Sequence, residues 1–143
     1  MDYNASFHIS ATGMAVEKMR LDVAAANLAN VHTSAPAGTQ PFRPMQVVAR
    51  ENPLTFAQQF GALEEAGGGG VEVVAVQAQN VAPSVVYEPG HPDADSAGYV
   101  TYPNVNPVME MTDLLSAVRA YQLNAAAVQA AKNMIQQSLQ ILS

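Results

Sequence analysis

The sequence predicts a mainly α-helical protein whose long N- and C-terminal helices pair as a coiled coil, with a small β-containing middle domain between them in the chain. Both ends carry apolar residues at alternating steps of three and four, the spacing of helices that pack along one seam. The middle holds eight of the nine prolines and eight of the nine glycines, which disfavour helix. We therefore expect a helical core domain, residues 1–34 and 107–143, and a loop- and β-rich outer domain, residues 35–106.

The first helix is expected from about Asn4 to Asn30, a stretch without proline and with one glycine, Gly13. Asn4 or Ser6 can cap its start. Lys18 fills the one gap in its stripe of apolar and small residues. The stripe consists of Phe7, Ala11, Met14, Leu21, Ala25 and Leu28.

The last helix is expected from about Pro107 to Leu142 and would be about 50 Å long at about 1.5 Å per residue. Its stripe has one exception, Lys132. Lys18 and Lys132 have two open interpretations: each fixes the register of the seam, or each lays its stem along the seam and keeps its amine in water. The stripe consists of Met111, Leu114, Val118, Tyr121, Ala125, Val128, Ile135, Leu139 and Leu142.

Neither helix carries enough apolar surface to be stable alone, so each needs a partner. Pairing leaves a second, partly apolar side on each helix, which includes Met19 and Leu115. We expect neighbouring subunits to cover this side; the alternative is that the outer domain folds back over it. The residues assigned to helix pairing and assembly are Phe7, Met14, Leu21, Leu28, Met111, Leu114, Val118, Tyr121, Val128, Ile135, Leu139 and Leu142.

Four short strands are predicted in the middle of the chain, because Val and Tyr gather there between turn residues. Two further segments are less regular. Leu54–Ala66 is expected to be a short helix or a loop, and Gly67–Gly70 a flexible joint. The predicted strands are Met45–Arg50, Val71–Val76, Ser84–Tyr87 and Tyr99–Tyr102.

Composition excludes several classes of function. Charged residues make up 13% of the chain, about half the usual share, which favours a surface covered by partners. The net charge is −6, and no Lys or Arg lies between Glu51 and Val118, so nucleic-acid binding is not expected. No apolar run is long enough to span a membrane, and no cysteine is present.

The most site-like cluster is His91, Asp93 and Asp95. These three side chains are too few for a zinc or calcium site, so a solvated turn is the favoured interpretation. An enzyme that uses His91 with Asp93 or Asp95 is the rival. Glu110 and Asp113 lie in the first turns of the last helix, where they favour the positive end of its dipole. We therefore predict no catalytic residues, metal site or cofactor.

Motifs at both ends give the chain a family resemblance. Asn27-Leu28-Ala29-Asn30, followed by Thr33 and Pro41-Phe42-Arg43, resembles the N-terminal motif of the flagellar rod and hook axial proteins. The stretch Glu110 to Lys132 resembles their C-terminal helix. The segment between them, Tyr87 to Asn106, and the short length resemble the proximal rod members. The match departs between about Ala35 and Gly70. The residues that carry it are Asn27, Asn30, Thr33, Phe42, Arg43, Pro89, Gly90, His91, Pro92, Tyr99, Pro103, Asn104, Asn106, Glu110, Arg119, Asn124 and Lys132.

The resemblance implies a structural subunit of the flagellar basal-body rod that assembles through its terminal helices into a helical drive shaft for torque. It also implies a place in the rod crossing the periplasm, reached by type III export without a cleaved signal peptide. The implied partners are copies of itself and other rod proteins, with the export gate or base and the surrounding rings as further candidates. The alternatives are another short rod-family subunit and a helical-hairpin adaptor for a single export or assembly partner.

Overall fold

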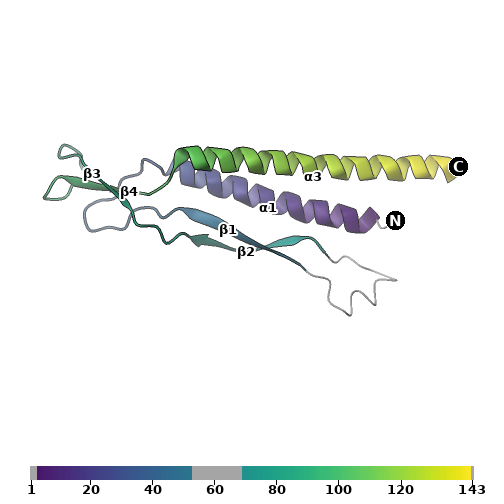
Figure 1. Ribbon diagram of the computed structural model, residues 1–143, viewed down its shortest axis with the longest axis horizontal. Coiled ribbons are helices and arrows are strands. Elements are labelled where there is room, and N and C mark those ends of the chain that lie inside the picture. The colour runs from purple at the N-terminus through teal and green to yellow at the C-terminus, as the bar shows by residue number, and fades with distance from the viewer. Residues whose placement is uncertain (1–2, 53–68, 143) are drawn as a thin grey trace. The chain divides into compact units, whose positions relative to one another are not determined.

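The computed structural model describes residues 3–52 and 69–142 (Figure 1). Two long helices pack together, and small antiparallel sheets lie between them in the chain, which confirms the predicted fold class. Leu54–Ala66, predicted as a short helix or a loop, lies outside the described residues, as do Gly67 and Gly68. The elements are α1 (Tyr3–Ala29), β1 (Met45–Glu51), β2 (Val71–Ala78), β3 (Ser84–Tyr87), β4 (Tyr99–Tyr102) and α3 (Pro107–Leu142).

The helix and strand bounds agree closely with those predicted. The first helix begins and ends one residue earlier than expected, and β3, β4 and α3 have the predicted bounds. The strand β1 is one residue longer than predicted and β2 is two residues longer. None of the helices in the described part of the chain is both long and apolar enough to cross a membrane.

The chain forms two compact units, and each combines helix with strand. The first unit comprises residues 1–19, 48–75 and 116–143, and the second comprises residues 20–47 and 76–115. This division runs through both helices, whereas the predicted domains end at residues 34 and 106. The predicted domain boundaries stay a prediction.

In the first unit, α1 and α3 approach each other through small side chains. A Cβ atom added to Gly13 would lie 2.9 Å from Asn124 Nδ2, so the backbone of α1 comes close to α3 at this point. Val16, Ala117 and Ala131 are buried. Close packing between small residues gives a tight seam that buries little apolar area per residue.

In the second unit, the β3–β4 hairpin supplies the most buried side chain. Val100 is fully buried, and the buried alanines of this unit are Ala24 and Ala35. The Ala35 amide donates to the Thr101 carbonyl at 3.2 Å, so the segment after α1 bridges to the outer edge of β4. Strand pairs align Ser84 with Tyr102 and Tyr87 with Tyr99.

The β1–β2 sheet is a two-stranded ribbon. The Gln79 amide donates to the Pro44 carbonyl at 2.7 Å, beside the start of β1, and the Asn52 amide donates to the Gly70 carbonyl at 2.9 Å, beside its end. The two strands are therefore antiparallel. Gly70 has a φ of 100° and lies against Thr12 of α1, so a side chain there would be strained and would overlap the Thr12 hydroxyl.

Candidate functional site

Asn27 links three elements of the second unit through its side-chain amide. It is 1% exposed, its Nδ2 donates to the Met45 carbonyl at 2.9 Å, and its Oδ1 accepts from the Met45 amide at 2.9 Å. Nδ2 also donates to Glu110 Oε1 at 3.1 Å. The amide thus completes the hydrogen bonds of the first residue of β1 as a neighbouring strand would, and ties it to α1 and to α3. We name Asn27, Met45 and Glu110 the junction.

Two other asparagines of the family motif stabilise helix ends. Asn106 Oδ1 accepts from the Val108 amide at 3.0 Å and the Met109 amide at 3.4 Å, which caps the start of α3. Asn30 Nδ2 donates to the Ala26 carbonyl at 2.8 Å near the end of α1. The Thr33 hydroxyl donates to Asn30 Oδ1 at 3.4 Å. The Asn106 side chain thus satisfies amides that the start of a helix leaves unpaired, and the Asn30 side chain adds a second bond to a carbonyl that already accepts from the Asn30 amide.

The polar groups of the His91–Asp95 turn bond backbone amides of the same turn and one side chain from the segment after α1. Asp95 Oδ1 accepts from the Ala97 amide at 2.8 Å and the Tyr99 amide at 2.9 Å, and the Ser34 hydroxyl donates to Asp93. His91 Nδ1 accepts from the Asp93 amide at 3.1 Å and lies 3.9 Å from Asp93 Oδ2. In residues 3–52 and 69–142, no three His, Asp or Glu side chains gather as a metal site would require.

The other motif residues of the hairpin fix its shape. A Cβ at Gly98, which has a φ of 84°, would lie 2.9 Å from the Tyr87 ring and 3.1 Å from Pro89. The Tyr102 hydroxyl donates to Glu88 Oε2 at 2.9 Å, and this bond raises the pKa of Tyr102 above its ordinary value. Pro103 is buried, whereas Gly90 and Pro92 are exposed.

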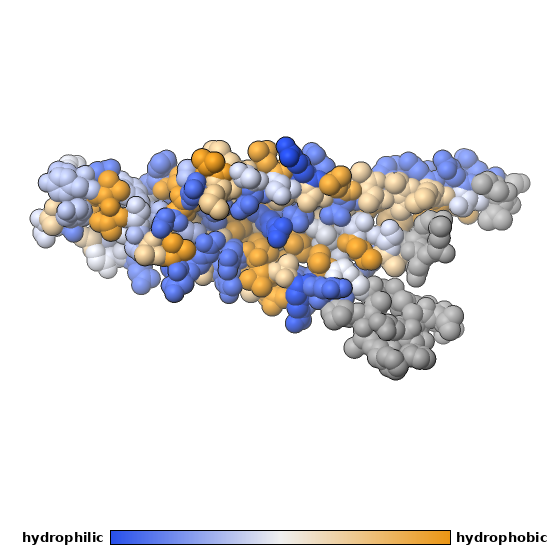
Figure 2. Space-filling model, in the orientation of Figure 1, coloured by the Kyte–Doolittle hydropathy of each residue, from blue (hydrophilic) through white to orange (hydrophobic). Residues whose placement is uncertain are grey.

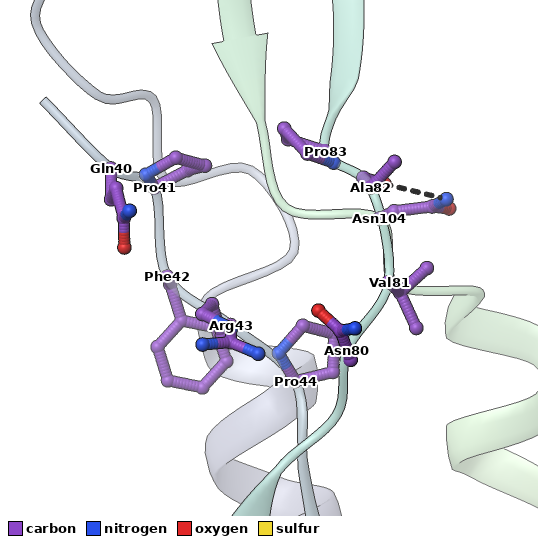
Figure 3. Close-up of a pocket in the computed structure, with 10 residues that line it drawn as sticks. All are labelled: Gln40, Pro41, Phe42, Arg43, Pro44, Asn80, Val81, Ala82, Pro83 and Asn104. Carbon is purple, nitrogen blue, oxygen red and sulfur yellow. Dashed lines mark hydrogen bonds between the residues drawn. The ribbon is translucent and has the colours of Figure 1, made fainter. Parts of the chain in front are cut away.

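A pocket of about 490 Å³ lies between the loop before β1 and the loop that joins β2 to β3 (Figure 3). Phe42 and Arg43 of the family motif line one side, and Asn104 lines the other. Arg43 Nη2 donates to the Gln79 carbonyl at 3.1 Å, and Asn104 Nδ2 donates to the Ala82 carbonyl at 3.1 Å, so both polar side chains hold the loops together. The lining includes no carboxylate, histidine or cysteine, and it therefore lacks the groups for acid–base or nucleophilic catalysis.

The residues predicted to pair the helices are not the most buried ones. Leu114, Val118 and other members are half-buried, whereas Met111, Tyr121 and Leu139 are exposed in the single chain. The half-buried members are Phe7, Met14, Leu21, Leu28, Leu114, Val118, Val128 and Ile135. Nothing is described of the Leu142 side chain. Whether these residues pair helices in an assembly stays a prediction.

The buried seam follows a neighbouring stripe of smaller residues. On α3 it runs through Ala117, Asn124 and Ala131, which recur every seven residues, and on α1 it includes Ser10 and Gly13. The predicted pairing residues have large apolar side chains, so they do not include these smaller positions. The regular spacing of small residues was the available signal, because it allows two helices to approach closely.

Large apolar side chains lie instead on the side of α3 away from this seam, which we name the outer face. Leu115 is 55% exposed and Leu123 is 72% exposed, and Val108 lies on the same side. Hydrophobic residues reach the surface over the first turns of α3 and in the hairpin (Figure 2). Arg119 and Lys132 of the family motif are exposed, and neither has a hydrogen-bond or ion-pair partner within the described part of the chain.

Comparison with known proteins gives one family. Residues 96–141 match the model described as flagellar basal body rod FlgEFG protein, C-terminal. Three similar proteins are each named flagellar basal-body rod protein FlgC. The protein of Borreliella burgdorferi is 34% identical over 146 residues and covers 96% of each chain. That of Escherichia coli O6:H1 is 38% identical over 133 residues, with 93% of this chain and 92% of the relative covered. That of Bacillus subtilis is 32% identical over 143 residues, with 95% of each covered.

Proposed function

The chain belongs to the FlgC family of flagellar basal-body rod proteins, and on that premise we propose that it builds the rod by packing its terminal helices against neighbouring subunits. Membership makes it a structural subunit of the proximal rod in the flagellar basal body, not an enzyme. Membership also implies assembly with other rod proteins. The surfaces and the specific partners are the proposal.

The observation that carries the proposal is the outer face of α3. Leu115, Leu123 and Val108 leave at least half of their surface in water in the single chain. Complete burial of each such side chain would contribute about 1.5–3 kcal/mol, so a partner helix that covers several of them gains substantial stability. Several large apolar side chains left exposed on one side of a helix favour an interaction site there.

A second surface lies at the C-terminal end of α3. The helices α1 and α3 run antiparallel, and Gly13 lies opposite Asn124. Because both helices rise by about 1.5 Å per residue, the start of α1 lies opposite about residue 134 of α3. Leu139 extends past that point and is 62% exposed. We propose that a helix of a neighbouring subunit continues the seam there.

Such contacts join different surfaces on the two partners, and they need not close into a ring. Repetition of one such contact therefore builds a helical assembly. A tube of many packed helices resists twisting, which suits a shaft that transmits torque through the periplasm. In this proposal the neighbours are copies of the chain and other rod proteins, and the export gate or base and the surrounding rings are further candidate neighbours. Delivery by type III export belongs to the same proposal.

The direct test is to substitute one predicted assembly residue near the C-terminal end of each long helix. Leu139→Asp and Leu28→Asp should abolish incorporation into basal bodies and swimming, because a buried unpaired carboxylate costs several kcal/mol. Gln137→Asp, an exposed polar position on the last turns of α3, is the matched control and should assemble normally. Electron microscopy of purified basal bodies with the chain located by density measures the outcome. An adaptor with one soluble partner would leave rods intact in all three variants, and that result would reject the proposal.

Coupling of helix formation to assembly gives an independent test. Helices that depend on neighbours for burial should be poorly ordered in a dilute subunit, so its helical circular dichroism signal should rise on assembly. Stable, full helicity in a verified dilute monomer would contradict this coupling.

A further inference from the structure

The β3–β4 hairpin has an inward face and an outward face. Side chains alternate across a strand, and Val100, whose side chain is fully buried, marks the inward face. Register pairs Tyr87 with Tyr99 on the opposite face, where Tyr87 is 62% exposed. Val85 lies on the same face and is also exposed. We name Val85, Tyr87 and Tyr99 the tyrosine patch.

The tyrosine patch is held in a fixed arrangement. The rings of Tyr87 and Tyr99 lie edge to face, with centroids 5.3 Å apart and planes at 63°. Gly98 packs beneath Tyr87, and Asp95 accepts from the Tyr99 amide, so both strands are braced from the turn. A preformed aromatic surface loses little conformational entropy when a partner covers it, which is why exposed tyrosines are enriched at interfaces.

The β3–β4 hairpin and residues 114–142 of α3 carry charged side chains of opposite sign. Residues 84–102 contain Glu88, Asp93 and Asp95 and no Lys or Arg. Residues 114–142 of α3 contain Arg119 and Lys132 and no Asp or Glu. Arg119 stands on the outer face between Leu115 and Leu123, without a partner among the described residues. An arginine set between aliphatic side chains suits a surface of aromatic rings with acidic neighbours, because guanidinium groups stack on ring faces.

We propose that the tyrosine patch of one copy docks on the Arg119-centred outer face of α3 in a neighbouring copy. The inference rests on the proposed rod function and adds a contact between the outer hairpin and a helix to the contacts between helices. The two surfaces differ, so the contact propagates from copy to copy. Three side chains of this size bury far less than the roughly 800 Å² per partner of a stable complex, so the contact forms only alongside other contacts in the assembled rod.

Photo-cross-linking in assembled basal bodies tests the contact without assuming the partner. With p-benzoyl-phenylalanine in place of Tyr87, irradiation should give a product of twice the chain mass. Its tryptic digest should join the hairpin to the peptide Ala120–Lys132, which contains Leu123. The matched control carries the same group in place of Tyr102, on the inward face, and should react within its own chain.

Three results would overturn the contact while basal bodies still contain the chain. They are a product with a different protein, a product within one chain from the Tyr87 position, and no product at all from that position. Absence of the chain from purified rods would instead reject the proposed function, so the two failures are distinguishable.

Charge reversal supplies a second measurement. In the Tyr87-substituted background, Arg119→Glu should reduce the dimer product at least tenfold, and Arg119→Lys should retain a larger share of it. Equal yields from the arginine and glutamate chains would contradict a role for Arg119. If the glutamate chain fails to assemble, the peptide mapping in the chain with Arg119 still decides the contact.

Discussion

In a globular protein the large apolar side chains of a helix are usually on its buried side, but in α3 they are on its exposed side. The side toward α1 buries alanines such as Ala117 and Ala131, whereas the outer face exposes Leu115 and Leu123. Small residues bring two helices close but bury little area, so the seam alone contributes modest stability. The larger apolar side chains stay exposed in the single chain, and they are the ones that we propose to contact neighbouring subunits. The difference teaches that the largest apolar side chains of α3 are not the ones that pack its helices together within the chain, which is what our proposed assembly through the outer face requires.

The largest expected effect on stability lies at the junction. Asn27→Leu removes the bonds to the half-buried Met45 amide and carbonyl and the bond to Glu110, so it should lower the free energy of unfolding by about 2–4 kcal/mol. The measurement is urea unfolding of the purified chain with trimethylamine N-oxide, which favours the folded helices. Asn52→Leu, at an exposed position, is the control. A loss below about 1 kcal/mol would show that the Asn27 amide does not hold α1, β1 and α3 together.

A smaller effect is expected where the helices come closest. Gly13→Leu forces a branched side chain against Asn124 and should cost about 1–3 kcal/mol by separating α1 from α3. Ala15→Leu, on an exposed side of the same helix, should change stability by less than about 0.5 kcal/mol. The same urea titration compares the two. Equal costs would contradict a tight small-residue seam.

A substitution on the outer face should affect assembly more than it affects the stability of the single chain. Leu123→Ser should change the free energy of unfolding by less than about 0.5 kcal/mol, because the side chain is exposed, yet it should reduce incorporation into basal bodies and swimming. Ser116→Ala, a similarly exposed position on α3, is the control for incorporation. Normal rods in the Leu123→Ser strain would contradict the proposal that the outer face of α3 contacts neighbouring subunits.

The smallest effect concerns the hairpin and pH. The bond from Tyr102 to Glu88 favours the neutral phenol and raises its pKa, so the folded hairpin keeps this contribution at neutral pH and loses it only as pH rises through the raised value. Glu88→Gln should therefore lower the pH at which Tyr102 ionises. Absorbance at 295 nm reports this titration in chains whose other four tyrosines, Tyr3, Tyr87, Tyr99 and Tyr121, are changed to Phe. An unchanged midpoint would show that the bond is absent in solution.

Sequence alone predicted the elements well and the contacts poorly. Helix and strand bounds follow from local signals, including Pro107 in the first turn of α3, the break after Asn30, and Val and Tyr in the strands. The seam was harder, because the single-chain contacts use Gly13 and Ala117, whose small side chains carry no hydrophobic signal. A helix seam within one chain and a helix seam between two chains have the same spacing of apolar residues. Periodicity therefore cannot predict which apolar side chains are covered by the chain itself and which by neighbours.

The motif asparagines give a sharper example. Asn27 was recognised as a motif residue, but nothing local indicates that its partners are the backbone of Met45 and the carboxylate of Glu110. Asn106 was also given only as a motif residue, although an asparagine just before Pro107 and a long helix is a local signal for the cap that it forms. Predictability thus falls with the sequence separation of the partners.

Cysteine labelling at Leu123 tests the central claim most directly, because the chain has no cysteine of its own. A Leu123→Cys chain should react with a maleimide in the purified subunit and become at least tenfold slower to react in intact basal bodies, whereas Thr39→Cys should react equally in both. Equal reactivity of the Leu123 position in subunit and rod would contradict burial of the outer face of α3 by a neighbouring subunit.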